Sequence, residues 1–405
     1  LGSEVESLRV ANSGKLPPFV APMVEQFLEQ ADGDTSRWQL QLDRLAGVEK
    51  VPDRDVPSGL AATLREYQVE GFRWLTWLRD LGFGGVLADD MGLGKTVQAL
   101  SLLLDIHQEP GPPSLVVAPT SVIYAWEEEA HRFTPDLKVH VHHGPRRPKK
   151  PPEGTDLVIT SYSLLRSDSE ALDGAWRAVV LDEAQRIKNP SSHVARVARQ
   201  LDARYRFALT GTPLENRLIE LWSVFECLMP GFFGSRSSFQ QRYATPIERD
   251  RDPEALAAMR RRIRPFVLRR LKSEVASELP PRQEQILYCE LGPQQRKLYE
   301  RVKQTYRQAV LTKVDEIGVQ RSTLPVLEAL MRLRQACCDP ALLPFPEAQQ
   351  VEESAKLELL METLTQTIAS GHRTLVFSQW TSLLALVIPR LKEAGWDHLY
   401  LDGKT

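Results

Sequence analysis

The sequence contains little cysteine, almost no net charge and no long apolar run. Only 4 of the 405 residues are cysteines, and none belongs to a C-x-x-C pair, so we expect reduced thiols and no disulfide framework. The 51 basic and 53 acidic residues nearly cancel, and a nucleic-acid partner would therefore have to bind local basic patches. No run of about 18 apolar residues is present, so we expect no transmembrane helix and no membrane partner.

Short apolar runs recur between residues 58 and 275, and helical patterns separate them. The runs are FGGVLA, SLVVAP, DLVITSY, RAVVLDE and RFALTG. They are rich in Val, Leu and Ile and do not alternate with polar residues, which is typical of strands buried on both faces of a parallel sheet. Strands and helices in alternation predict an α/β fold with a doubly wound parallel sheet. Residues 1–57 are predicted to form an accessory segment of short amphipathic helices.

The remaining sequence predicts helices and the beginning of a second sheet. Residues of about 217–263 are predicted to form a helical protrusion of the first domain, and residues 276–405 a second domain with a helical insert at about 292–345. Three apolar runs, EQILYCEL, TLVFS and HLYLDG, are strand-like. So few strands cannot close a core of their own, and we therefore expect the chain to stop before the second sheet is complete.

The stretch DDMGLGKT, residues 89–96, joins an apolar run to a helical pattern. Gly92 and Gly94 would let the backbone approach a phosphate group, and N–H groups at the start of the helix would bind it. Lys95 would reach the β- and γ-phosphates of a nucleotide, and the hydroxyl of Thr96 would bind Mg²⁺. The alternative is a chance Gly-Lys-Thr at an ordinary turn.

The stretch AVVLDEAQ is an apolar strand that ends in two carboxylates. Asp182 at the strand end can bind Mg²⁺, directly or through water, and Glu183 can orient and deprotonate the attacking water. A helix cap at Asp182 is the alternative. A phosphate loop and an acidic strand end in one parallel sheet together indicate a nucleotide hydrolase.

These stretches resemble the Swi/Snf-type DNA-translocating ATPases of helicase superfamily two. The family's motifs appear in order over about residues 60–405 as LREYQVEGFRWL, DDMGLGKT, VVAPTSVIYAWEEE, VITSYSLL, DEAQRIKNP, LTGTPLENRLIELWSVF, RPFVLRRLKSEVASELPP, LRQACCDPALL and TLVFSQWTSLL. The family also has an aspartate where Asp89 replaces the usual leading glycine. Motifs V and VI would follow YLDGKT, and motif VI supplies arginine fingers, so we expect this chain to hydrolyse ATP poorly.

The resemblance implies a RecA-like fold and a role for each matching position. The residues that would contact ATP are Gln68, Asp90, Met91, Gly92, Leu93, Gly94, Lys95 and Thr96; the catalytic residues would be Lys95, Asp182 and Glu183; and the Mg²⁺ ligands would be Thr96 and Asp182. The residues that would couple hydrolysis to lobe closure are Gln185, Thr210, Gly211 and Thr212. The residues that would line the DNA groove are Pro119, Thr120, Thr160, Ser161, Ser378 and Gln379.

The arginine-rich stretch RRRIRPFVLRRLK, residues 260–272, is a further candidate for phosphate contact. Its arginines could instead form ion pairs with carboxylates between the lobes.

We therefore expect the parent protein to be an ATP- and Mg²⁺-dependent motor. It would move along double-stranded DNA without separating the strands and would displace a bound protein such as a polymerase or a repair factor. The alternatives are a nucleotide-gated DNA clamp with little turnover and a strand-separating helicase or RNA motor. The protein would be cytoplasmic and nucleoid-associated in a prokaryote and nuclear in a eukaryote.

Overall fold

The computed structural model of the chain describes residues 51–148, 150–211, 217–275, 284–317 and 323–403. The chain divides into two compact units, Leu1–Pro281 and Arg282–Thr405. Most of the predicted accessory segment, residues 1–50, lies outside the described residues. Among the described helices, none has the length and apolar character needed to cross a bilayer.

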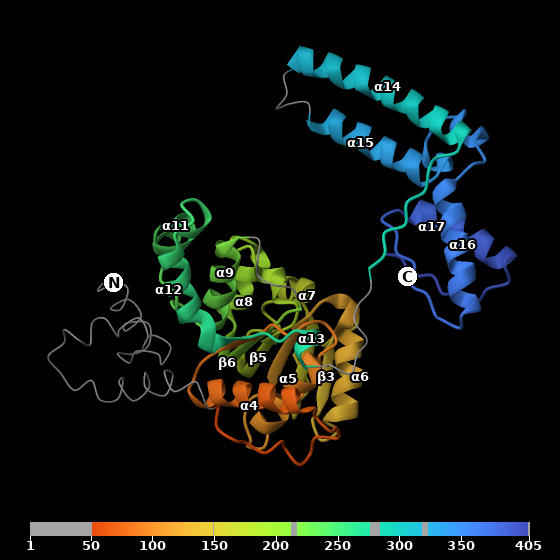
Figure 1. The fold of residues 1–405 in the computed structure, drawn as a ribbon. Helices are drawn as coiled ribbons and strands as arrows, with labels where there is room; N and C mark the ends of the chain where they lie inside the picture. The colour runs from red at the N-terminus through yellow and green to blue at the C-terminus, as the bar shows by residue number, and fades with distance from the viewer. Residues whose placement is uncertain (1–50, 149, 212–216, 276–283, 318–322, 404–405) are drawn as a thin grey trace. The chain divides into compact units, whose positions relative to one another are not determined.

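The first unit is built on a seven-stranded parallel sheet with the order β3-β4-β2-β5-β6-β1-β7 (Figure 1). Its strands are β1 (Gly85–Leu87), β2 (Ser114–Ala118), β3 (Val139–His142), β4 (Leu157–Ser161), β5 (Ala175–Leu181), β6 (Asp202–Leu209) and β7 (Val267–Leu268). Each of the five apolar runs of the sequence forms one of these strands. The prediction of a RecA-like α/β fold with a doubly wound parallel sheet is confirmed.

Helices follow most strands of the sheet. They are α4 (Glu66–Asp80), α5 (Lys95–Ile106), α6 (Ile123–Phe133), α7 (Tyr162–Ser167), α8 (His193–Gln200) and α9 (Leu218–Leu228), with the short 3₁₀ turns η2 (Thr120–Val122) and η3 (Ala184–Ile187). Further helical elements lead to β7 and beyond it: α10 (Arg236–Phe239), the π-turn η4 (Gln240–Ala244), α11 (Thr245–Glu248), α12 (Pro253–Ile263), the 3₁₀ turn η5 (Arg264–Phe266) and α13 (Lys272–Val275).

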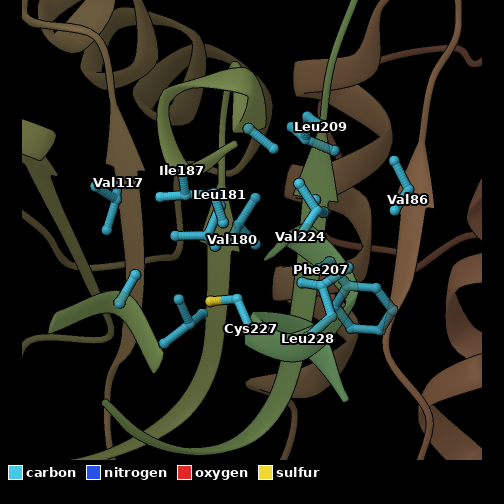
Figure 2. Packing of buried hydrophobic residues seen from close by; sticks show 14 of the residues in the cluster. Val86, Val117, Val180, Leu181, Ile187, Phe207, Leu209, Val224, Cys227 and Leu228 are labelled. Carbon is cyan, nitrogen blue, oxygen red and sulfur yellow. The ribbon is translucent and has the colours of Figure 1, made fainter. Parts of the chain in front are cut away.

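A continuous apolar core holds the sheet and its helices together. Strands β2 and β4 are buried along their whole length. Figure 2 shows Phe207 of β6 beside Val224 and Leu228 of α9, which close one part of this core. Because neighbouring strands pair on both sides of β1, β2, β4, β5 and β6, their backbone groups are satisfied without water.

The second unit is helical. Its elements are α14 (Pro293–Ile317), α15 (Thr323–Cys338), η7 (Pro340–Leu342), η8 (Ala348–Gln350), α16 (Ala355–Ala369) and α17 (Thr381–Glu393). The helices α14 and α15 pack against each other and share a small core that includes Leu298, Val302 and Ala336.

The three strand-like runs of the second part of the sequence do not form strands. Residues 284–291, 374–378 and 398–403, which form these runs, have irregular backbone without ladder pairing. The side chain of Phe377 is 87% exposed and that of Leu375 is 83% exposed. A strand needs a paired neighbour to satisfy its backbone N–H and C=O groups, and in the described residues of this unit no segment supplies one. The prediction of buried strands here is therefore wrong.

Candidate functional site

The carboxyl ends of β1, β5 and β6 place the predicted nucleotide residues at one edge of the parallel sheet. The N–H of Thr210, which follows β6, donates to the carbonyl oxygen of Leu87 at the end of β1 (3.1 Å). The N–H of Asp182, which follows β5, donates to the carbonyl oxygen of Val117 (2.9 Å). Ligands of open α/β sheets bind at this edge because the loops that leave the strands meet there.

The loop between β1 and α5 has the backbone conformation of a phosphate cradle. Gly92 and Gly94 have φ angles of 83° and 76°, a region that side chains other than hydrogen disfavour. Gly94 is also the N-cap of α5, so the first amides of the helix face the loop without a capping side chain. A Cβ atom on Gly94 would lie 2.4 Å from Nε2 of Gln68. The loop therefore depends on glycine both for its conformation and for its packing.

Lys95 is the first residue of α5, and its side chain reaches back to the loop. Its Nζ donates to the carbonyl oxygens of Asp89 (2.8 Å) and Asp90 (3.2 Å). Burial lowers the pKa of Lys95, while the charges of Glu183 and Asp182, among other nearby carboxylates, act in the opposite direction. The structure thus brings the predicted lysine and the acidic strand end into one electrostatic environment, where a cation faces both the loop and the carboxylates.

Asp182 is held by three donors. The indole Nε1 of Trp126 donates to its Oδ2 (2.8 Å), the N–H of Glu183 donates to its Oδ1 (2.9 Å), and the hydroxyl of Tyr162 donates to its carbonyl oxygen (2.6 Å). Burial raises the pKa of Asp182, and the hydrogen bond from Trp126 opposes that rise. The carboxylate consequently has one orientation, and each oxygen keeps an acceptor position for a further donor or a cation.

Glu183 has a left-handed backbone conformation, with φ of 50°, which is uncommon for a residue other than glycine. Its Oε2 accepts a hydrogen bond from Nε2 of Gln185 (2.7 Å), and Oε1 of Gln185 accepts one from the hydroxyl of Thr210 (3.1 Å). A Cβ atom on Gly211 would lie 2.6 Å from Cγ of Met91 and 3.4 Å from Nζ of Lys95. Three of the four predicted coupling residues thus lie together beside the loop, and Thr212 lies outside the described residues.

Gln68 contacts the phosphate loop directly. Its Nε2 donates to the carbonyl oxygen of Leu93 (3.1 Å), and its Oε1 accepts from the N–H of Arg65 (3.0 Å). Its predicted contact with ATP stays a prediction, and the structure adds that Gln68 joins the start of α4 to the loop.

Asp89 forms a buried ion pair that the sequence reasoning did not identify. Its carboxylate accepts hydrogen bonds from the N–H (3.1 Å) and the Nε (3.0 Å) of Arg270, which follows β7. The guanidinium of Arg270 also donates to Oε1 of Gln98 on α5 (2.8 Å). Arg270 belongs to the arginine-rich stretch that was predicted to contact phosphate, but its side chain is buried and holds the phosphate loop to β7. For Arg270 the prediction of phosphate contact is therefore wrong, and its carboxylate partner lies within the same unit.

The predicted DNA-contacting residues of the first unit differ in exposure. Thr120 is exposed at the start of η2, and Pro119 before it is half-buried. Thr160 and Ser161 are buried, and their hydroxyls are used within the fold: that of Thr160 donates to the carbonyl oxygen of His142 (3.1 Å), and that of Ser161 accepts from the N–H of Leu164 (3.2 Å). DNA contact through these two hydroxyls is therefore not favoured.

Ser378 and Gln379, the two residues of the second unit that were predicted to contact DNA, lie just before α17. The hydroxyl of Ser378 bonds the backbone of Trp380, and Oε1 of Gln379 accepts from Arg334 of α15 (2.6 Å). The guanidinium of Arg334 also stacks over the ring of Trp380, with 5.4 Å between its Cζ and the ring centroid.

The residues at the sheet edge fit a nucleoside triphosphate with Mg²⁺. Glycines at positive φ, free helix amides and a lysine suit the phosphates. The carboxylate of Asp182 and the hydroxyl of Thr96 are oxygen ligands of the kind that Mg²⁺ prefers. Burial raises the pKa of Glu129 on α6, and the nearby hydroxyl of Thr96 opposes that rise, so a third carboxylate lies beside the site.

Comparisons with known proteins agree with this geometry. A model of the SNF2-related domain matches residues 67–342. A putative ATP-dependent helicase/translocase of Bacillus subtilis is 42% identical over 84% of this chain and 38% of its own length. The TATA-binding protein-associated factor MOT1 of Saccharomyces cerevisiae is 35% identical over 80% of this chain and 19% of its own length. The chain thus spans well under half the length of these relatives.

A solved structure gives the same result. The Sulfolobus solfataricus SWI2/SNF2 ATPase core in complex with double-stranded DNA is 36% identical, with a TM-score of 0.55, and the match covers 85% of this chain and 73% of that one. Sequence, fold and the arrangement at the sheet edge therefore lead to one conclusion: the chain belongs to the SNF2-related domain family, the Swi/Snf-type ATPases of helicase superfamily two.

Proposed function

We propose that the protein containing this chain is a motor that hydrolyses ATP to move along double-stranded DNA and displace bound proteins without separating the strands. The chief support is the position of Lys95 between the phosphate loop and the carboxylates of Asp182 and Glu183. This arrangement has the parts that phosphoryl transfer to water requires, namely a cation for the phosphates and a carboxylate for the water.

In this proposal the residues of the first unit divide the reaction between them. The loop amides and Lys95 bind the β- and γ-phosphates, Glu183 orients the attacking water and accepts its proton, and Thr96 and Asp182 would hold Mg²⁺. When bound, Mg²⁺ neutralises charge that develops on the phosphate oxygens. The hydrogen bonds from Glu183 through Gln185 to Thr210 provide a path by which the state of the nucleotide reaches the stretch after β6.

The DNA substrate and the lobe assignment are parts of the same proposal. Residues 58–275 would form the first RecA-like lobe with its helical protrusion, and residues 276–405 the start of the second. The S. solfataricus core was solved with double-stranded DNA, which supports a duplex as the track. MOT1 is a TATA-binding protein-associated factor, which supports a protein on DNA as the target of displacement.

The proposal is tested by ATP turnover of the full-length protein with duplex DNA, single strands and RNA. Turnover should depend on duplex DNA, and the substitution Lys95→Ala should reduce it by about 10²–10³-fold, as expected when a group that stabilises developing charge is removed. Lys138→Ala, at an exposed lysine before β3, should leave turnover unchanged. Unchanged turnover in Lys95→Ala would reject the site.

Two other readouts separate the proposal from its alternatives. Displacement of one strand of a forked duplex, or equal stimulation by RNA, would show a strand-separating helicase or an RNA motor. Tight nucleotide-dependent DNA binding with negligible turnover in the full-length protein would show a clamp.

A further inference from the structure

Both residues predicted to bind Mg²⁺ are contacted by the same helix, α6. Nε1 of Trp126 on α6 donates to Oδ2 of Asp182 (2.8 Å). The carboxylate of Glu129, also on α6, lies close enough to Thr96 for the hydroxyl of Thr96 to oppose the rise of its pKa. The residues Trp126 and Glu129 are three positions apart, so they lie on one face of the helix, one turn above the other. Neither residue was assigned a role from the sequence.

The contact from Trp126 is well suited to fix Asp182. Its side chain is 2% exposed and packs in the main core, so its ring has little freedom to move. A buried indole N–H needs an acceptor, and here its acceptor is Oδ2 of Asp182 at 2.8 Å. Together with the bond from the N–H of Glu183 to Oδ1, this contact determines the plane of the carboxylate.

Glu129 lies on the same side of α6 as the buried residues of that helix. Ile123, Trp126 and Ala130 of α6 are buried and form its sheet-facing side, and Glu129 is half-buried between the last two. Burial raises the pKa of this carboxylate, and the neighbouring hydroxyl of Thr96 opposes that rise. An ionisable group therefore lies on the side of α6 that approaches Asp182 and Thr96.

We propose that Trp126 and Glu129 are positioning residues that orient Asp182 and Thr96 for Mg²⁺-nucleotide. The inference rests on the proposed function, because it needs these two residues to act at the metal. Residues that hydrogen-bond to a metal ligand hold that ligand in one orientation. Removal of such a residue typically reduces metal affinity by about 10–100-fold.

The test measures how much Mg²⁺ strengthens nucleotide binding, without using turnover. The affinity of the full-length protein for ADP is determined by calorimetry with Mg²⁺ and with EDTA, for the wild type, Trp126→Phe, Glu129→Ala and Glu129→Gln. The strengthening by Mg²⁺ should fall about 10-fold or more in Trp126→Phe and Glu129→Ala, while the affinity in EDTA stays near that of the wild type. Glu129→Gln keeps an acceptor for Thr96 and should recover part of the loss.

Trp176→Phe is the matched control. Trp176 is also a buried tryptophan, but its Nε1 donates to the carbonyl oxygen of Leu172 (3.0 Å). The variant Trp176→Phe should lower thermal stability as much as Trp126→Phe does, but Mg²⁺ should still strengthen ADP binding as it does in the wild type. A Mg²⁺ effect of wild-type size in both Trp126→Phe and Glu129→Ala would overturn the inference. If Trp126→Phe does not fold, the Mg²⁺ dependence of the two Glu129 variants decides whether α6 positions the metal ligands, because Glu129 is only half-buried.

The failure of this inference is distinguishable from failure of the proposed function. If the wild type binds ADP with Mg²⁺ and Lys95→Ala does not, the nucleotide site stands, and normal Mg²⁺ dependence in the α6 variants rejects only the role of α6. If the wild type shows no Mg²⁺-dependent nucleotide binding, both proposals fail.

Discussion

Strand β2 of the first unit and residues 374–378 of the second unit have the same kind of sequence but different surroundings. Both are short apolar runs, yet Leu115 of β2 is 0% exposed whereas Phe377 is 87% exposed. β2 pairs with β4 on one side and β5 on the other, and residues 374–378 have no pairing partner among the described residues. The comparison shows that an apolar run becomes a buried strand only when other segments satisfy its backbone and cover its faces.

The two units should differ most in how much free energy of unfolding is lost when a phenylalanine in such a run is replaced by alanine. Phe207→Ala in β6 should reduce the free energy of unfolding by about 4 kcal/mol, because it removes a fully buried ring from the core beside α9. Phe377→Ala should change it by less than about 0.5 kcal/mol, since the ring is exposed. Chemical denaturation of the full chain measures both, and equal effects would contradict the comparison.

A somewhat smaller effect is expected at the ion pair of the phosphate loop. Asp89→Ala should cost about 3 kcal/mol, because it leaves the guanidinium of Arg270 buried without its carboxylate. The same substitution should weaken nucleotide binding, since the ion pair holds the loop to β7.

The double variant Asp89→Leu with Arg270→Met separates these two effects. It should recover much of the stability, because an apolar pair can replace a buried ion pair at little cost. If nucleotide affinity recovers as well, the ion pair does not position the loop.

The smallest effect is expected for an ion pair on the surface of the second unit. Lys303 and Glu300 lie 3.1 Å apart on α14, and each side chain is 49% exposed. Glu300→Ala should change the free energy of unfolding by less than about 0.5 kcal/mol, because water screens the pair. A loss as large as that of Asp89→Ala would show that burial does not determine how much these ion pairs stabilise the fold.

Much of the nucleotide site was predictable from local sequence. Lys95, Asp182, Glu183, Gln185, Thr210 and Gly211 follow strands of one parallel sheet, and the carboxyl ends of such strands meet at one edge. The contacts that orient these residues were not predictable in the same way. Arg270 meets Asp89 across 181 positions of the chain, and nothing in an arginine-rich stretch says which carboxylate it will reach.

Motif matching also overlooked two residues within a stretch that it recognised. Trp126 and Glu129 lie in VVAPTSVIYAWEEE. Their spacing of three, and the apolar residues Ile123 and Ala130 at helical spacing beside them, were available in the sequence as a signal that both side chains lie on one side of a helix. The partners of that side, Asp182 and Thr96, become visible only when the helix is packed on the sheet.

Local sequence was enough to predict five of the seven strands of the first unit, the phosphate loop with its two glycines, and the acidic end of β5. These features depend on local conformation: glycine at positive φ shapes the loop, and short apolar runs form buried strands. Tertiary structure alone decided which apolar runs are buried, which hydroxyls are used within the fold, and which side chains orient Asp182 and Asp89. The reason is that pairing, burial and long-range ion pairs depend on which distant segment arrives beside a residue, and one segment's sequence does not contain that information.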